Sequence, residues 1–303
     1  MDDLKVEGAT AKQLIAIADG LAQIGEFTTA AELYRSALPS ANAEQRNRLY
    51  VRLGIVSTPR PDRAQFMAAL REVETFGVNV FVGASLITWN KTMPFCDDAR
   101  FMALTEKHAA LLPIPNWHWN FQTVLWAIQR TRTIEGDFVE LGVFKGHTTM
   151  FLAEYVGFET WPKRWRLYDT FEGIPEDQLD PGWDRLNSDL YVGKFGVEEV
   201  RKRFSTYPNI DVIQGRVPEI FDTVVPEKIA FLHIDLNNSA AEIAALDALY
   251  DRISPGGVII FDDYAWLNAR AQYNAERKWF AARGLEVLPI PTGQGVFVKP
   301  GQA

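Results

Sequence analysis

The chain has 303 residues, of which 47% are hydrophobic and 12% aromatic, so it can bury a full core in one large domain or two smaller ones. Its net charge of −8 at pH 7 argues against a broad nucleic-acid-binding surface. Cys96 is the only cysteine, which excludes an intramolecular disulfide and a thiolate metal cluster. The first residues, MDDLKVEGAT, lack the apolar stretch of a secretory signal, and no apolar run approaches the roughly 20 residues of a membrane span. We therefore predict a soluble cytoplasmic protein with neither a nucleic-acid nor a membrane partner.

Residues 1–111 have a helical pattern, with apolar residues three and four positions apart and no convincing strand run. Within them, residues 11–42 resemble one tetratricopeptide unit, whose apolar and small positions hold Leu14, Ile17, Leu21, Gly25, Phe27, Ala30, Tyr34 and Ala37. A solenoid needs about three such repeats, and the sequence has no second copy. We therefore favour a helical cap or dimerisation surface over a peptide-binding platform, and leave open a homo-oligomer or a protein partner. Residues 62–77 predict a further helix beginning near Pro61.

Residues 112–303 change to short apolar runs that alternate with helical stretches. The runs are DFVELGV (137–143), RWRLYDTF (164–171), IDVIQG (210–215), IAFLHIDL (229–236) and GGVIIFDDY (256–264). Strands separated by crossover helices predict a mostly parallel sheet that is covered on both faces. The last segments, LEVLPI and GVFVKP, predict an antiparallel pair that closes one edge of this sheet. The prediction is a Rossmann-like, doubly wound α/β domain preceded by an all-helical region.

Most of the five runs end in a polar or acidic side chain. In chain order these are Glu140, Asp169, Gln214, Asp235 and the pair Asp262-Asp263. In an open parallel sheet, ligands bind outside the carboxyl ends of the strands. One acid at a strand end is explained equally well as a solvated helix cap. Acids at four strand ends together favour a shared site.

The turn after the first run indicates which ligand this site takes. VELGVFKGHTT has only Gly142 and Gly146, whereas the dinucleotide fingerprint has three glycines. Glu140, just before the turn, would repel a diphosphate but suits a ligand that carries an ammonium and a sulfonium. Asp169, at the end of the second run, is placed to accept hydrogen bonds from both hydroxyls of a ribose. S-adenosylmethionine therefore fits the set better than NAD.

Four segments carry a resemblance to a known family. GDFVELGVFKGHTT, YDTFEGIPE, FLHIDLNNS and GGVIIFDDY are similar, in order and spacing, to the macrocin/mycinamicin-type (TylF-like) O-methyltransferases over residues 120–298. The resemblance implies a class I, S-adenosylmethionine-dependent enzyme that methylates a hydroxyl of a sugar-like or polyhydroxylated small molecule, assisted by Mg²⁺ or another divalent cation. It also implies that Glu140, Gly142 and Gly146 form the turn at the methionine end, and that Asp169 holds the ribose. We further expect cofactor contacts from His147, Thr148, Thr170, Gln214 and Gly215.

The family also implies that Asp235, Asp262 and Asp263 ligate the metal, because Mg²⁺ takes carboxylates, waters and substrate oxygens. Consecutive residues of a strand point to opposite faces. Asp262 and Asp263 therefore serve one ion only if the strand has turned by Tyr264. If the strand stays extended, one of the two acids caps a helix instead.

The sequence departs from the family on the fourth run. Many members have Asp-x-Asp there, with the second acid as the proposed base, but this chain has Asp235-Leu236-Asn237. An amide cannot accept the hydroxyl proton, so the base is left open, with Asp235, Asn237 and His147 as the candidate catalytic residues. His233 is predicted to be a core histidine. The departure keeps two alternatives: a cofactor-binding or scaffold protein without catalysis, and a methyltransferase that acts on nitrogen or carbon.

Overall fold

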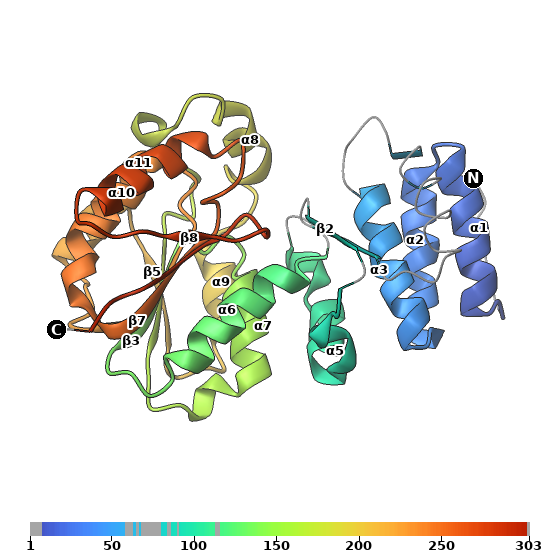
Figure 1. Cartoon of the computed structure of the whole chain (residues 1–303), viewed down its shortest axis with the longest axis horizontal. Coiled ribbons are helices and arrows are strands. Elements are labelled where there is room, and N and C mark those ends of the chain that lie inside the picture. The colour runs from blue at the N-terminus through green and yellow to red at the C-terminus, as the bar shows by residue number, and fades with distance from the viewer. Residues whose placement is uncertain are drawn as a thin grey trace. The chain divides into compact units, whose positions relative to one another are not determined.

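A computed structural model describes residues 8–57, 63–64, 67, 80–83, 86–89, 91–112 and 116–301. The chain divides into two compact units, Met1–His118 and Trp119–Ala303 (Figure 1). Most of the helix predicted over residues 62–77 lies outside the described residues. Within the described part of the chain, no helix has the length and apolar character needed to cross a bilayer.

The N-terminal unit begins with three helices, α1 (Ala11–Gln23), α2 (Phe27–Ala37) and α3 (Ala43–Ser57). α1 starts in a capping box, in which the side chains of Thr10 and Gln13 each accept a hydrogen bond from the other residue's backbone N–H. All three helices meet at Asp19, which accepts hydrogen bonds from the Tyr34 hydroxyl at 2.6 Å and from Arg52 Nε at 2.8 Å. α1 and α2 thus lie where the repeat-like pattern predicts two helices, and their identity as a tetratricopeptide unit stays a prediction.

A β-hairpin in the same unit corrects the prediction of an all-helical region. β1 (Val80–Gly83) pairs antiparallel with β2 (Leu86–Trp89). Both strands are rich in β-branched and aromatic residues, which favour strands, but four residues are too few to establish a two-residue period. α5 (Ala99–Lys107) follows, capped by Asp98, whose side chain accepts a hydrogen bond from Phe101 N at 2.9 Å.

The second unit is built on a seven-stranded sheet with the order β5-β4-β3-β6-β7-β9-β8. Strands β3 to β7 are parallel, and β9 is antiparallel to both of its neighbours. The strands are β3 (Asp137–Leu141), β4 (Trp165–Asp169), β5 (Ile210–Gln214), β6 (Ile229–Ile234), β7 (Ile253–Phe261), β8 (Leu288–Pro289) and β9 (Gly295–Val298). This confirms the predicted doubly wound α/β fold and the antiparallel pair at its edge.

Helices cover the sheet on both faces. They are α6 (His118–Arg130), α7 (His147–Val156), α9 (Val197–Phe204), α10 (Ser239–Leu249) and α11 (Arg270–Ala281), whereas α8 (Asp184–Leu190) lies at the carboxyl ends of the strands (Figure 1). The chain steps from β3 to β4 in one direction along the sheet and from β6 to β7 in the other. Right-handed crossovers therefore put α7 and α10 on opposite faces (Figure 1). All six residues of β6 are buried, so the core is centred on this strand.

The reversal of strand order falls between β3 and β6. At such a switch point the two crossovers leave in opposite directions and open a crevice at the carboxyl ends of the strands, where doubly wound proteins bind their ligands. The polar residues that the sequence predicts at the strand ends lie at this same edge of the sheet.

Candidate functional site

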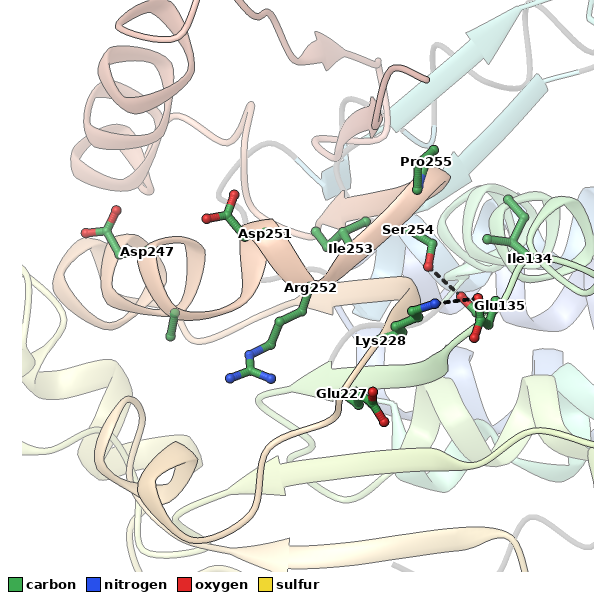
Figure 2. A pocket seen from close by; sticks show the side chains of 11 residues that line it. Ile134, Glu135, Glu227, Lys228, Asp247, Asp251, Arg252, Ile253, Ser254 and Pro255 are labelled. Atoms are coloured by element: carbon green, nitrogen blue, oxygen red, sulfur yellow. Dashed lines mark hydrogen bonds and ion pairs between the residues drawn. The ribbon is translucent and has the colours of Figure 1, made fainter. Parts of the chain in front are cut away.

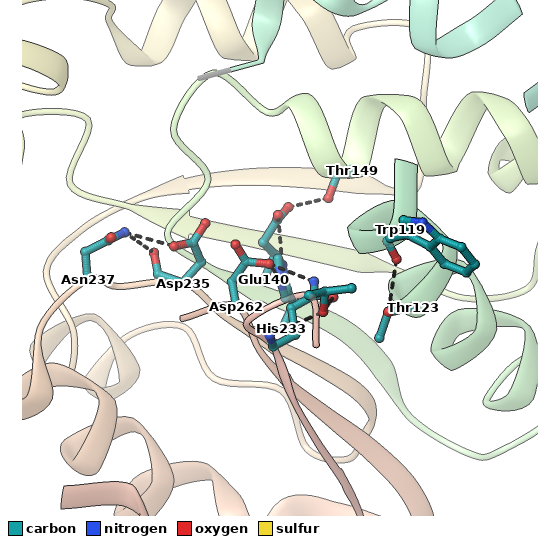
Figure 3. A network of polar contacts seen from close by, with 10 residues as sticks. Trp119, Thr123, Glu140, Thr149, His233, Asp235, Asn237 and Asp262 are labelled. Carbon is teal, nitrogen blue, oxygen red and sulfur yellow. Dashed lines mark hydrogen bonds and ion pairs between the residues drawn. The ribbon is translucent and has the colours of Figure 1, made fainter. Parts of the chain in front are cut away.

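The predicted polar strand ends lie next to one another along one edge of the sheet. Asp169 pairs with Gln214 in the β4–β5 register. Further along, Asp235 N donates to Leu141 O at 2.8 Å, and Asp262 N donates to Ile234 O at 2.9 Å. The parallel pairing thus continues past the ends of β6 and β7 and brings Asp235 and Asp262 onto neighbouring strand ends (Figure 3).

The glycine turn between β3 and α7 is packed too tightly for side chains at its two glycines. Gly142 has φ +84°, and a Cβ there would lie 1.8 Å from the backbone oxygen of Asp235. Gly146 has φ +76°, and a Cβ there would lie 2.7 Å from the Phe204 ring. Both positions require glycine because of their left-handed backbone and this close approach. The turn consequently lies directly against the end of β6.

Asp169 fastens the glycine turn to β4. One carboxylate oxygen, Oδ2, accepts hydrogen bonds from the backbone N–H groups of Val143 at 2.7 Å and Phe144 at 2.8 Å. The other, Oδ1, accepts one from Phe171 N at 2.7 Å. Burial raises the pKa of Asp169, and these three backbone donors offset only part of that effect. An acid held in this way presents its carboxylate at the same place whether or not a ligand is bound.

A pocket of about 480 Å³ opens beside Asp169, at the ends of β4 and β5. Of the predicted cofactor contacts, Thr170, Gln214 and Gly215 line it. Gln214 Nε2 donates to Thr170 O at 3.1 Å, which links the two strand ends. Asn187 closes the far wall by accepting from Ile174 N at 2.8 Å and donating to Ile174 O at 3.0 Å. The volume of this pocket is typical of sites that bind small molecules.

The strand-end acids Asp169, Asp235 and Asp262 form an acidic edge. Within and beneath it, the side chains of Glu140, His233 and Asp262 meet (Figure 3). His233 Nδ1 lies 3.2 Å from Glu140 Oε1, and His233 Nε2 lies 3.5 Å from Asp262 Oδ1. Thr149, on α7, donates to the other oxygen of Glu140. Burial alone would keep the imidazole neutral, but its contacts with Asp262 and Glu140 outweigh burial and raise the pKa of His233 to about 10. His233 is buried within β6, as predicted, and the raised pKa of its imidazole favours the charged form between these two acids.

Asp262 is held from two sides. Burial raises its pKa, but the neighbouring His233, 3.5 Å away, outweighs burial and lowers it overall. The hydrogen-bond donor is Gln294, whose Nε2 lies 2.8 Å from Asp262 Oδ1. The sequence pattern gave no role to Gln294, because it lies 32 residues further along the chain in the edge hairpin.

Asn237, the residue at the departure from the family pattern, is bonded to Asp235. Its Nδ2 donates to Asp235 Oδ1 at 2.8 Å, and its backbone has the left-handed φ of 58°. Asparagine tolerates this conformation better than most residues. Burial raises the pKa of Asp235 well above its ordinary range, and the charges of Asp262 and Asp263 raise it further. The pKa of Asp235 is thus raised where that of Asp262 is lowered, and Asn237 orients the Asp235 carboxylate.

The three predicted metal ligands have the charge that a dication requires, but in the described part of the chain they do not have the spacing. Asp262 N still donates to Ile234 O, so the pairing runs to Asp262, and the chain has turned by Tyr264, as binding of one ion by both acids would require. Burial together with Asp262 and Glu242 raises the pKa of Asp263. This excess of carboxylate charge suits a hard dication chemically. Yet among the residues that the structure describes, no three His, Cys, Asp or Glu side chains lie close enough to hold a metal ion.

His147 and Thr148 form the first turn of α7, next to Gly146, and both are buried. Burial lowers the pKa of His147 to about 4, despite the opposing charge of Glu140. The imidazole is consequently neutral near pH 7 and only weakly basic, so it is a poor candidate for the base compared with Asp235.

A larger pocket, of about 790 Å³, lies at the opposite end of the strands (Figure 2). Both cations that line it are engaged. Lys228 Nζ lies 2.6 Å from Glu135 Oε2, and Arg252 donates to Pro226 O at 3.2 Å. None of the predicted site residues lines it. Size alone therefore does not make it the functional site.

Known proteins match the part of the chain that carries these strand ends. The family Macrocin-O-methyltransferase (TylF) matches residues 119–286. The 8-demethyl-8-(2,3-dimethoxy-alpha-L-rhamnosyl)-tetracenomycin-C 4'-O-methyltransferase of Streptomyces olivaceus is 32% identical, over 44% of this chain and 54% of that protein. The mycinamicin III 3''-O-methyltransferase of Micromonospora griseorubida is 28% identical, over 43% of this chain and 56% of that protein.

Among solved structures, the O-methyltransferase NovP superposes with a TM-score of 0.52 at 22% identity, covering 60% of this chain and 80% of that one. This similarity supports the fold. The matched region spans about half the length of the two curated relatives, so their activities do not transfer to the whole chain without a test.

Proposed function

Because the chain belongs to the macrocin O-methyltransferase (TylF) family, we propose that it is an S-adenosylmethionine-dependent O-methyltransferase acting on a hydroxyl of a sugar-like small molecule. The observation that carries this proposal is the acidic edge beside the glycine turn, where Asp169 and Asp235 lie on either side of Gly142. The relatives named above support a sugar acceptor, since one of them is named for a rhamnosyl substrate.

The cofactor is proposed to lie along the strand ends, with its adenosine in the pocket of about 480 Å³ between β4 and β5. Asp169 would accept hydrogen bonds from the ribose hydroxyls through oxygens that the backbone already orients. The methionine end would pass over Gly142, where a side chain would collide with the backbone of β6. Glu140 would act on the cofactor's positive charge only indirectly, because Thr149 and His233 already engage its carboxylate.

Asp235 is the proposed base. In the reaction, the acceptor oxygen attacks the sulfonium methyl, a C–O bond forms as the C–S bond breaks, and the hydroxyl proton passes to the Asp235 carboxylate. S-adenosylhomocysteine then leaves. A raised pKa brings a carboxylate nearer to the working pH and makes it a better proton acceptor. Asn237 would hold that carboxylate in place instead of accepting the proton itself.

As an alternative to proton transfer to a free Asp235, we propose that a divalent cation assists. Asp235, Asp262 and Asp263 would hold it, and it would neutralise the carboxylate charge that raises the pKa of Asp235 and Asp263, so that Asp235 would then act as a ligand and not as the base. A bound dication would supply Lewis acidity, lowering the pKa of the acceptor hydroxyl.

Cofactor binding is the first test. Titration calorimetry with S-adenosylhomocysteine should give saturable binding, and Asp169→Asn should weaken it about tenfold or more, because a hydrogen bond to a charged group is lost. Asp211→Asn is the matched control, since Asp211 lies on the adjacent strand but pairs with Arg164 at a distance from the pocket. No binding by the unmodified chain would overturn the proposal.

Turnover is the second test. The chain should release S-adenosylhomocysteine when given S-adenosylmethionine and a panel of methyl glycosides that includes methyl α-L-rhamnoside. If a cation assists, EDTA should reduce the rate and added Mg²⁺ should restore it. Full turnover in EDTA would refute the metal part and leave the transferase part standing. If the chain methylates only amines in this assay, the acceptor atom is nitrogen and not oxygen.

A further inference from the structure

The tip of the C-terminal hairpin, residues 290–294, reaches into the acidic edge through one buried side chain. Gln294 has no exposed surface, and its Nε2 donates to Asp262 Oδ1 at 2.8 Å. Its Oε1 accepts the hydroxyl of Thr292 at 3.0 Å, which fixes which end of the amide faces Asp262. The sequence pattern had assigned this hairpin only to closing the sheet edge.

The hairpin tip is also bonded to the segment that follows the acid pair. Ala265 N donates to Gly293 O at 2.7 Å, and a Cβ at Gly293 would lie 2.0 Å from Trp266 Nε1. Within the tip, Ile290 N donates to Gln294 O at 2.9 Å. These contacts fix the position of the Gln294 backbone relative to Asp262, so the side chain has little freedom to move away.

Gln294 and His233 both face Oδ1 of Asp262, but only Gln294 forms a hydrogen bond with it. Gln294 lies 2.8 Å from Oδ1, within good hydrogen-bond distance, whereas His233 Nε2 lies 3.5 Å from the same oxygen. His233 faces this oxygen as an ion-pair partner without a hydrogen bond, so the bond from Gln294 is the directional contact at Oδ1.

We propose that Gln294 is a positioning residue, which holds Oδ1 of Asp262 towards the hairpin and thereby fixes how Asp262 meets His233 and the acidic edge. This inference rests on the proposed methyl transfer for its kinetic consequence and on the geometry of Asp262 for its structural one. Partners that orient a functional carboxylate in this way typically change activity about ten- to hundredfold when removed.

Gln294→Met tests it, because methionine has a similar length and cannot donate. In protein labelled with ¹⁵N-histidine, only four imidazoles contribute signals. At constant pH and with no acceptor present, the Gln294→Met change should shift the Nε2 signal of His233 and leave those of His108 and His118 in place. With an acceptor that turns over, kcat should fall about ten- to hundredfold, with little change in the KM for S-adenosylmethionine.

Thr292→Val is a milder second variant, since it leaves Gln294 in place and removes only the hydroxyl that orients it. It should move the His233 signal in the same direction by a smaller amount. Gln178→Met is the matched control, because Gln178 is also buried but donates to Val217 O at 2.9 Å. An unchanged His233 signal in both hairpin variants would overturn the inference. This readout needs neither cofactor nor acceptor, so a failure of the proposed transferase function would show separately as absent binding or turnover.

Discussion

Asp235→Asn is expected to lower kcat about 10²- to 10⁴-fold, the usual range for removing a general base. The substitution keeps the size of the side chain, and an oxygen at this position still accepts the hydrogen bond from Asn237 Nδ2. What it removes is the only group of the Asp235-Leu236-Asn237 segment that can take up the hydroxyl proton. The affinity for S-adenosylhomocysteine should change little, because the proposed cofactor contacts lie on β3 to β5. Steady-state kinetics and calorimetry on the same preparation separate the two quantities.

Asp211→Asn is again the control, because the same atoms change on the same sheet, in an exposed ion pair with Arg164. A normal kcat for Asp235→Asn would assign the proton to another acceptor. An unmodified chain that binds cofactor without turnover, and gains turnover on Asn237→Asp, would instead favour the alternative of a cofactor-binding protein that has lost its base.

The strand ends were the predictable part of this site. Each depends only on where an apolar run stops, and parallel strands align their carboxyl ends at one edge. Asp169, Asp235 and Asp262 could therefore be placed near one another from sequence, as could the glycine turn at Gly142. Their hydrogen bonds could not, since the three backbone donors to Asp169 arise from the detailed path of two separate loops.

His233 shows what the pattern leaves out. The residue lies within an apolar run and is buried, as predicted, but the run does not reveal that its imidazole pairs with Glu140. A signal was nevertheless present in the register: His233 is two positions before Asp235, and therefore on the same strand face, and it pairs directly with Glu140 on β3. Gln294 had no such signal, because its contact with Asp262 depends on the antiparallel return of β9. The β1–β2 hairpin was missed for a different reason, namely that its strands are too short to show a period.

The second large effect concerns stability. His233→Leu should reduce the free energy of unfolding by about 3–5 kcal/mol, because it leaves Glu140 and Asp262 buried without their shared cation. We expect this loss to come more from the uncompensated carboxylate charges than from packing. Adding Glu140→Gln to His233→Leu should therefore recover part of the stability, because only one buried carboxylate then lacks a counter-ion. Urea unfolding of the full chain, followed by circular dichroism, measures both variants.

His118→Leu separates charge from packing in this comparison. His118 is as buried as His233, but burial lowers its pKa to about 4, so it is neutral, and it packs edge-on against the Tyr50 ring at 4.9 Å. Replacing a neutral ring in an apolar cluster by leucine should cost less than about 1.5 kcal/mol. Equal losses at the two histidines would mean that His233 acts as a packing residue. A much larger loss at His233, partly reversed by Glu140→Gln, would identify it as the cation that allows two acids to lie buried beside the acidic edge.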